Sequence, residues 1–242
     1  MAPIDPSRAH AIEGWVAWHG RLMVAAWAVL VPLGILAARF FKVMPKQDWP
    51  RRLDNPGWWH AHRGLQYAAG LLTFAAAGAI LMALGRPRLS GIHAACGWSV
   101  LLLAVVQYSG GWLRGSKGGP TAPASDGSLR GDHYDMTARR RLFEYVHKSV
   151  GYLAWLLACV AITTGLWRAN APVGFWLAIA GWWALCVAAF AVLQRRGRAI
   201  DTYQAIWGAD ARHPGNRLRP IGWGVRRPDP TGAHEHDHDP QP

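Results

Sequence analysis

The chain has 242 residues, of which 51% are hydrophobic and only 17% are charged, and its formal net charge is +12. Soluble domains carry charge on about a quarter of their residues, so this composition argues against a soluble protein and favours one embedded in a bilayer. The basic residues lie between apolar runs rather than in one patch. This spacing excludes nucleic acid as the expected partner and favours loops that orient the chain in a membrane.

Five apolar runs follow one another along the chain, and each is long enough to cross a bilayer, which takes about 20 residues in a helix. None of them alternates as a barrel strand would, so helices are expected. The sequence therefore predicts an all-α integral membrane bundle with five transmembrane helices. Pro32 should kink the first of them. The approximate limits are Trp15–Lys42, Trp58–Leu84, Leu89–Leu113, Phe143–Trp167 and Val173–Leu193.

The segments outside these runs divide the chain into four parts. Residues 1–14 contain two prolines and no apolar stretch of a signal peptide, so the first run should act as its own insertion signal. Residues 15–194 form the transmembrane part, and residues 195–230 form a soluble tail. Residues 231–242, with His234 and His238, are expected to be a disordered His-rich end, and weak metal binding is the alternative.

Basic residues are unequally divided between the two sides of the predicted bundle. The side that holds the N-terminus, here called the N-terminal side, has Arg8, Arg86, Arg88 and Arg168. The opposite side, here called the basic side, should be cytoplasmic, because cytoplasmic loops carry an excess of Lys and Arg. The N-terminus is then outside and the tail inside. The basic side contains Lys42, Lys46, Arg51, Arg52, Arg114, Lys117, Arg130, Arg139, Arg140, Arg141, Arg195, Arg196 and Arg198.

Four of the five runs each hold a histidine near their N-terminal end, namely His19, His62, His93 and His147. Successive helices run in opposite directions, so His19 and His93 should lie toward the N-terminal side, and His62 and His147 toward the basic side. Two facing imidazoles can supply both axial ligands of one haem iron. His60 is a rival in the second run, but it lies about half a helical turn from His62, so both cannot face one iron. We prefer His62.

Glycine accompanies two of these histidines one helical turn later, as Gly97 after His93 and Gly151 after His147. A missing side chain on the ligand's face leaves room for a porphyrin. The alternative is that each histidine is an interfacial side chain that reaches toward water, but four of them paired at two depths favour ligation. We therefore predict two bis-histidine haem groups inside the first four helices, with the fifth helix peripheral.

Arg39 lies near the basic-side histidine pair at the end of the first run. One interpretation is that it pairs with haem propionates or attracts an anionic reductant. The other is that it orients the helix at the membrane interface. Both interpretations stay open, and Arg39 is kept as a candidate haem-binding residue.

The chain resembles the cytochrome b561 family, most closely the membrane module that is joined to DOMON domains in eukaryotes and stands alone in bacteria. The resemblance runs from His19 to about Arg227, and it is specific only when its pieces are taken together. The matching residues are His19 and Gly20; Trp27, Pro32, Gly34 and Ala38 to Phe40; Trp58, Trp59 and His62 to Gln66; His93, Gly97 and Gln107; His147, Gly151 and Tyr152; and Asp201 to Gln204, Trp207 and Gly208.

The resemblance implies two b-type haems, one for each histidine pair, and one-electron transfer across a membrane, often from cytosolic ascorbate to monodehydroascorbate or ferric iron outside. It implies a bacterial inner membrane, lipid contact, and a small-molecule or protein electron donor and acceptor, with a homodimer left open. Without a DOMON domain in the chain, an extracytoplasmic haem partner is expected to be a separate protein or absent. Three alternatives stay open: a reductase of ferric chelates or quinone, an anchor subunit for another redox enzyme, and a helical transporter without haem.

Overall fold

The computed structural model describes residues 2–8, 12, 14–85, 90–116 and 130–228. Within these residues, five helical spans are long and apolar enough to cross a membrane, which confirms the predicted all-α bundle. The first span is continuous and consists of α1 (Gly14–Met23), a π-helical segment η1 (Val24–Leu30) and α2 (Val31–Phe40). The others are α3 (Gly57–Leu84), α4 (Ile92–Trp112), α5 (Ala138–Arg168) and α6 (Val173–Arg195). Arg86, Arg88, Lys117 and the His-rich end lie outside the described residues.

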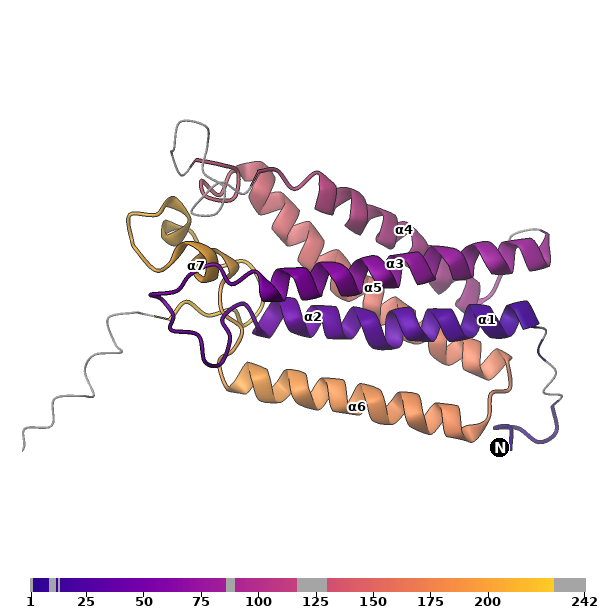
Figure 1. Ribbon diagram of the computed structural model, residues 1–242. Helices are drawn as coiled ribbons and strands as arrows, with labels where there is room; N and C mark the ends of the chain where they lie inside the picture. The colour runs from indigo at the N-terminus through magenta and orange to yellow at the C-terminus, as the bar shows by residue number, and fades with distance from the viewer. Residues whose placement is uncertain (1, 9–11, 13, 86–89, 117–129, 229–242) are drawn as a thin grey trace, which may run out of the picture.

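The spans are arranged as two packed pairs with a fifth helix at the side (Figure 1). The first span packs along α3, and α4 packs along α5, while α6 contacts α2. The core between them is built largely from small side chains, which let helices approach closely in lipid. Its buried residues include Ala26, Ala28, Ala69, Ala104, Ala154 and Ala158.

The first span is irregular directly before Pro32, where the sequence predicts a kink. A proline lacks an N–H and its ring clashes with the carbonyl four residues earlier, which is Ala28 O. The π-helical segment Val24–Leu30 covers this position, and Trp182 Nε1 on α6 donates to Ala28 O at 2.6 Å. The carbonyl that proline leaves without its helical donor is thus satisfied by α6, and this bond fastens the peripheral helix to the core.

The fourth spanning helix begins at Ala138 rather than at the predicted Phe143. Thr137 caps it, since its hydroxyl accepts a hydrogen bond from Arg140 N at 3.2 Å. Arg140 then pairs with Glu144 one turn later, with Nε 3.1 Å from Oε1. The basic run 139–141, which the sequence assigned to a loop, is therefore the first turn of α5.

The tail after α6 is folded onto the end of the bundle where α7 lies in Figure 1. It contains α7 (Thr202–Trp207) and a short 3-10 turn, η2 (Pro214–Arg217). Tyr203 and Trp207 are buried there against Met136 and Ile221. The sequence predicted a soluble tail without further structure, and the structure shows that the tail forms a small apolar cluster together with the segment before α5.

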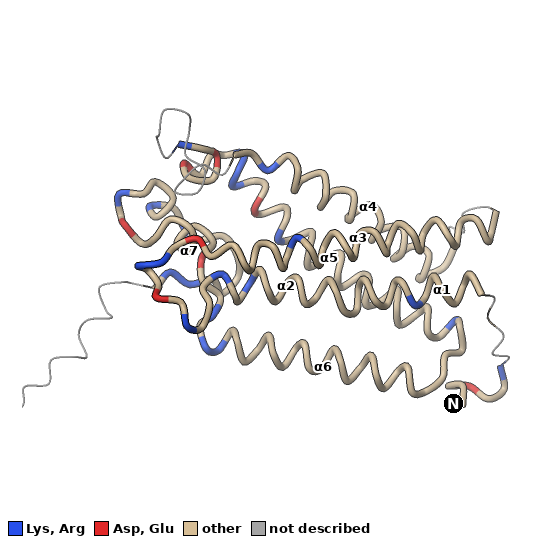
Figure 2. The backbone as a smooth tube through the Cα atoms, viewed as in Figure 1, with Lys and Arg blue, Asp and Glu red and all other residues tan. Residues whose placement is uncertain are grey.

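Lys and Arg residues gather around this same end of the helices and are sparse at the end near the N-terminus, as Figure 2 shows. The unequal distribution agrees with the predicted division into a basic side and an N-terminal side. Among the basic residues there, Lys42 is buried, and Arg227 Nε lies 2.6 Å from Asp201 Oδ2 inside the tail. Basic side chains therefore also hold the tail in place.

Candidate functional site

The four predicted histidines meet in two pairs inside the bundle. His19 on α1 faces His93 on α4, and their ring centroids are 6.2 Å apart with the ring planes at 80°. His62 on α3 faces His147 on α5 with the same separation of 6.2 Å and the same angle of 80°. Each pair joins the first-span and α3 pair of helices to the α4 and α5 pair, so the rings face each other across the space between the two helix pairs.

The separation of the rings is the one that an intervening metal ion requires. A metal–imidazole bond is about 2 Å long, and roughly 1.1 Å more separates the ring nitrogen from the ring centre, so two imidazoles on one metal have centroids about 6 Å apart. Both observed pairs fit this distance. Imidazole nitrogen on both sides is also a donor set that haem iron accepts.

Three of the four rings are held by a main-chain carbonyl of the helix packed beside their own. A bond from Nδ1–H to an acceptor fixes the neutral tautomer and leaves Nε2 free to bind a metal. The acceptors are Ala76 O for His19 at 3.1 Å, Gly34 O for His62 at 3.0 Å, and Ala161 O for His93 at 2.9 Å. The sequence did not reveal these acceptors, since a main-chain carbonyl carries no residue signature.

The two pairs lie at different depths, as the alternating helix directions predicted. On α3, His62 belongs to one pair, whereas Ala76 O serves the other, and the helical rise of about 1.5 Å per residue separates them by about 21 Å. On α5, His147 and Ala161 O are about 21 Å apart by the same reasoning. The space between the pairs is packed with the small-residue core and with Trp27, whose Nε1 donates to Thr73 Oγ1 at 2.9 Å.

The two predicted glycines differ in their surroundings. A methyl group added at Gly97 would meet no atom within 4 Å among the described residues, so open space remains beside His93. A methyl group at Gly151 would lie 3.1 Å from Gln107 Nε2, so this glycine admits a glutamine side chain. Gly70 lies on the same face of α3 as His62. The Tyr108 hydroxyl occupies the space beside it and would lie 2.3 Å from a methyl group added there.

Gly165 is a site residue that the sequence analysis missed. A methyl group there would lie 3.1 Å from His93 Cε1 and 3.3 Å from Nδ1. Gly165 follows Ala161 by one turn of α5, and Ala161 O is the acceptor for His93. In the sequence, Gly165 is only a glycine near the end of a transmembrane run, and many helices have one there.

His60, the rival of His62, is exposed to the surroundings of the bundle, whereas His62 is half-buried and faces His147. Arg39, in the last turn of α2, contacts α5, α6 and the tail. Its guanidinium donates to Gln194 Oε1 at 2.8 Å, to Trp223 O at 2.5 Å and to Tyr152 Oη at 3.3 Å. These bonds make Arg39 an anchor of the tail at the basic side.

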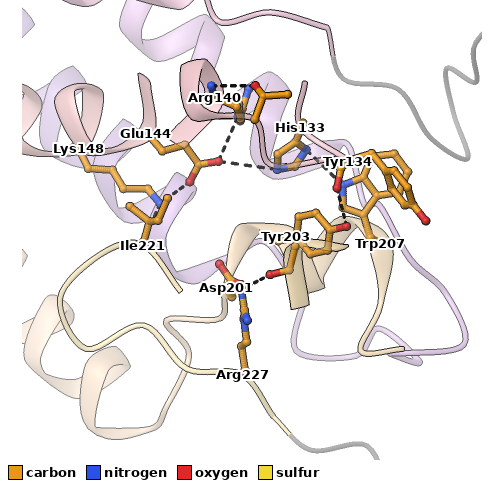
Figure 3. Close-up of polar contacts among 12 residues, drawn as sticks. His133, Tyr134, Arg140, Glu144, Lys148, Asp201, Tyr203, Trp207, Ile221 and Arg227 are labelled. Atoms are coloured by element: carbon orange, nitrogen blue, oxygen red, sulfur yellow. Dashed lines mark hydrogen bonds and ion pairs between the residues drawn. The ribbon is translucent and has the colours of Figure 1, made fainter. Parts of the chain in front are cut away.

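A buried polar cluster connects α5 to the tail (Figure 3). Glu144 accepts from Arg140 Nε at 3.1 Å and from Lys148 Nζ at 2.8 Å, and His133 Nε2 lies 3.8 Å from its carboxylate. Lys148 Nζ also donates to Ile221 O of the tail at 2.8 Å. Because Lys148 follows His147 directly, the cluster helps to fix the rotation of α5 where it presents that ring.

Lys42 is the second link between the bundle and the tail. Its Nζ donates to Ile200 O at 3.1 Å and is buried. Burial, together with the charges of Lys148 and Arg39, lowers the pKa of Lys42 to about 7, against the opposing effect of Asp201. The basic end of the bundle therefore contains an amine that changes charge close to neutral pH.

The fold and the site define the class of this protein: a helical integral membrane protein with two facing histidine pairs that can each hold a metal-centred group. Comparisons with known proteins identify the family. The chain is 31% identical over 186 residues to a cytochrome b561, DM13 and DOMON domain-containing protein of Arabidopsis thaliana. The matched region covers 74% of this chain and 18% of that protein. It is 30% identical over 172 residues to ferric-chelate reductase 1 of Bos taurus, covering 65% of this chain and 25% of the relative.

The human ferric-chelate reductase 1 is 29% identical over 170 residues. No protein-family model and no solved structure matches the chain. The chain belongs to the cytochrome b561 family, as its sequence motifs indicated. Membership of this family implies haem b as cofactor and membrane electron transfer as the class of activity. The chain spans about a quarter or less of the length of these relatives.

Proposed function

We propose that the protein transfers single electrons across the membrane through two haem b groups, one at each histidine pair. The observation that carries this proposal is the pair of matching separations, 6.2 Å between His19 and His93 and 6.2 Å between His62 and His147. Bound haem iron supplies the one-electron couple. Neither ring pair needs to move far to accept a metal ion, since its spacing already fits two metal–nitrogen bonds.

The residues of the chain position, orient and insulate the two sites. Carbonyls of Ala76, Gly34 and Ala161 hold Nδ1 of three rings, which leaves Nε2 of each ring free to bind a metal ion. The packed core between the pairs, with Trp27 bonded to Thr73, excludes water from the path. The folded tail lies at the end of the bundle near the basic-side pair, where Lys148 Nζ donates to Ile221 O at 2.8 Å.

The proposed orientation of the protein in the membrane follows the distribution of charge. The basic side is placed in the cytoplasm and the N-terminal side outside it, because Lys and Arg gather at the end covered by the tail. The protein is placed in a bacterial inner membrane, as the resemblance to stand-alone members implies. An electron donor then meets the tail side and an acceptor meets the side where α1 begins.

A second function is favoured by the comparisons. Two of the relatives carry the name ferric-chelate reductase 1, and this chain is proposed to reduce a ferric chelate on the N-terminal side through the His19 and His93 site. Arg8 and Arg168 at that end provide positive charge for an anionic chelate. A quinone acceptor or a separate redox enzyme remains the competing destination for the electron.

The test is a reduced-minus-oxidised spectrum with haem quantification on the purified chain and on four single variants, His19→Ala, His62→Ala, His93→Ala and His147→Ala. We expect about two haems per wild-type chain, with bis-histidine b-type bands. Either member of a pair should remove the same spectral component, and His60→Ala should remove none. A wild-type protein that takes up no haem, or a loss that follows His60 instead of His62, would contradict the proposal.

A further inference from the structure

The fourth histidine breaks the pattern that the other three share. His19, His62 and His93 each have Nδ1 on a carbonyl of the helix packed beside their own. His147 Nδ1 is buried, yet it has no hydrogen-bond partner among the residues that the structure describes. An axial imidazole that binds through Nε2 carries its proton on Nδ1, and that N–H needs an acceptor.

The helix packed beside α5 is α4, so the pattern predicts that α4 provides the acceptor. At this position α4 presents the side chain of Gln107 instead of a free carbonyl. Gln107 Nε2 donates to His147 O at 2.7 Å, and Gly151 admits the amide, because a methyl group there would lie 3.1 Å from Nε2. The amide is thus fastened to the residue whose ring lacks a partner.

The other end of the same amide is also unsatisfied. Gln107 Oε1 is buried and has no hydrogen-bond partner within the described parts of the chain. Gln107 and His147 line one groove between α4 and α5, together with Val106, Gly110, Phe143 and Val146. One buried donor and one buried acceptor without partners therefore share a groove that is otherwise almost entirely apolar, and buried polar groups in proteins are paired in the large majority of cases.

We propose that Gln107 is the positioning residue for His147, with Oε1 accepting the Nδ1–H of the ring when the basic-side haem is bound. This inference rests on the proposed function, since it concerns the second ligand of that haem. Gln107 then binds the backbone of His147 through Nε2 and its ring through Oε1. Its Oε1 is the acceptor for this ring, as a main-chain carbonyl is for each of the other three rings. It also makes the basic-side pair the only one of the two, within the described residues, whose ligand basicity depends on a replaceable side chain.

The predicted consequence is a reduction potential that responds to the chemistry at position 107. Oxidation of the iron makes Nδ1–H a stronger donor, so a better acceptor stabilises the oxidised form. Gln107→Glu should lower the midpoint potential of the basic-side haem, and Gln107→Leu should raise it. The potential of the N-terminal-side haem should stay unchanged in both variants.

The experiment is a redox titration of the intact haem-loaded protein in detergent, with the basic-side component assigned as the one missing in His62→Ala. Gln66→Leu is the matched control, because Gln66 Nε2 donates to Val31 O while the nearby His62 ring has its own carbonyl. Opposite shifts in the Glu and Leu variants, with no shift in the control, would support the assignment. Shifts of the same sign in both, no shift in either, or an equal shift in Gln66→Leu would overturn it. A protein with two haems and an unresponsive position 107 would refute this inference alone, whereas a protein without haem would refute the proposed function.

Discussion

Replacing Gly165 by alanine tests whether the His93 ring is clamped against α5. The added methyl group would lie 3.1 Å from His93 Cε1, closer than ordinary van der Waals contact, so the ring must retreat by a few tenths of an ångström. The ring cannot retreat freely, because its Nδ1 is held at 2.9 Å from Ala161 O on the same helix. Overpacking of this kind costs about 1–3 kcal/mol, whereas alanine in a helix gains about 0.5–1 kcal/mol over glycine.

At the midpoints of these two ranges the net cost of Gly165→Ala is roughly 1.25 kcal/mol, and it falls on the geometry of one ligand. At about 1.4 kcal/mol for each factor of ten, we expect the affinity for the N-terminal-side haem to fall roughly eightfold, with the basic-side haem retained. Haem titration of the apoprotein, read at the two spectral components, measures this. Gly181→Ala on α6 is the control, since a methyl group there meets no atom within 4 Å. Full affinity at both sites in Gly165→Ala would refute the clamp.

Three further changes probe the open space, the central bond and the tail. Gly97→Ala has room in the apoprotein, so it should leave apoprotein melting unchanged or slightly higher and yet weaken haem uptake at the N-terminal side; equal uptake would argue against a porphyrin beside that glycine. Thr73→Val removes the acceptor of Trp27 Nε1 and should destabilise the protein by about 1–3 kcal/mol in thermal melts, with the double variant carrying Trp27→Phe recovering part of the loss. The pKa of Lys42 is about 7 when folded and 10.5 ordinarily, so the unfolded chain binds more protons between these values and this residue's contribution to stability rises with pH from 7 toward 10. Melts at pH 7, 8 and 9 should rise more steeply in wild type than in Lys42→Met, and parallel slopes would contradict this.

The spanning helices and the depth of each histidine were predictable from the sequence because both depend on strong, simple constraints. Lipid requires long apolar helices, and helices that alternate in direction place residues near their N-terminal ends at alternating faces. Helical spacing predicted that His60 and His62 cannot both face one iron, and the structure places His62 half-buried opposite His147 and His60 at the surface.

The features that the sequence missed are those in which the important atom belongs to the backbone or to a distant segment. Gly34 and Ala161 contribute carbonyls, and any residue type has one. The tail was assigned as soluble because its residues are too polar to span a membrane, but Tyr203 and Trp207 find apolar partners in a segment about seventy positions earlier, as Tyr203 Oη donating to Tyr134 O at 2.7 Å illustrates. Such pairings depend on the bundle bringing the two segments to one end.

Two helices each contribute a group to both histidine pairs. The helix α3 presents His62 to one pair and Ala76 O to the ring of His19 in the other, and α5 does the same with His147 and Ala161 O. A small rotation of either helix about its axis therefore disturbs a ligand at one depth and the acceptor of a ligand at the other. Close packing of small residues resists such rotation. The small-residue core thus supports the geometry of both proposed haem sites.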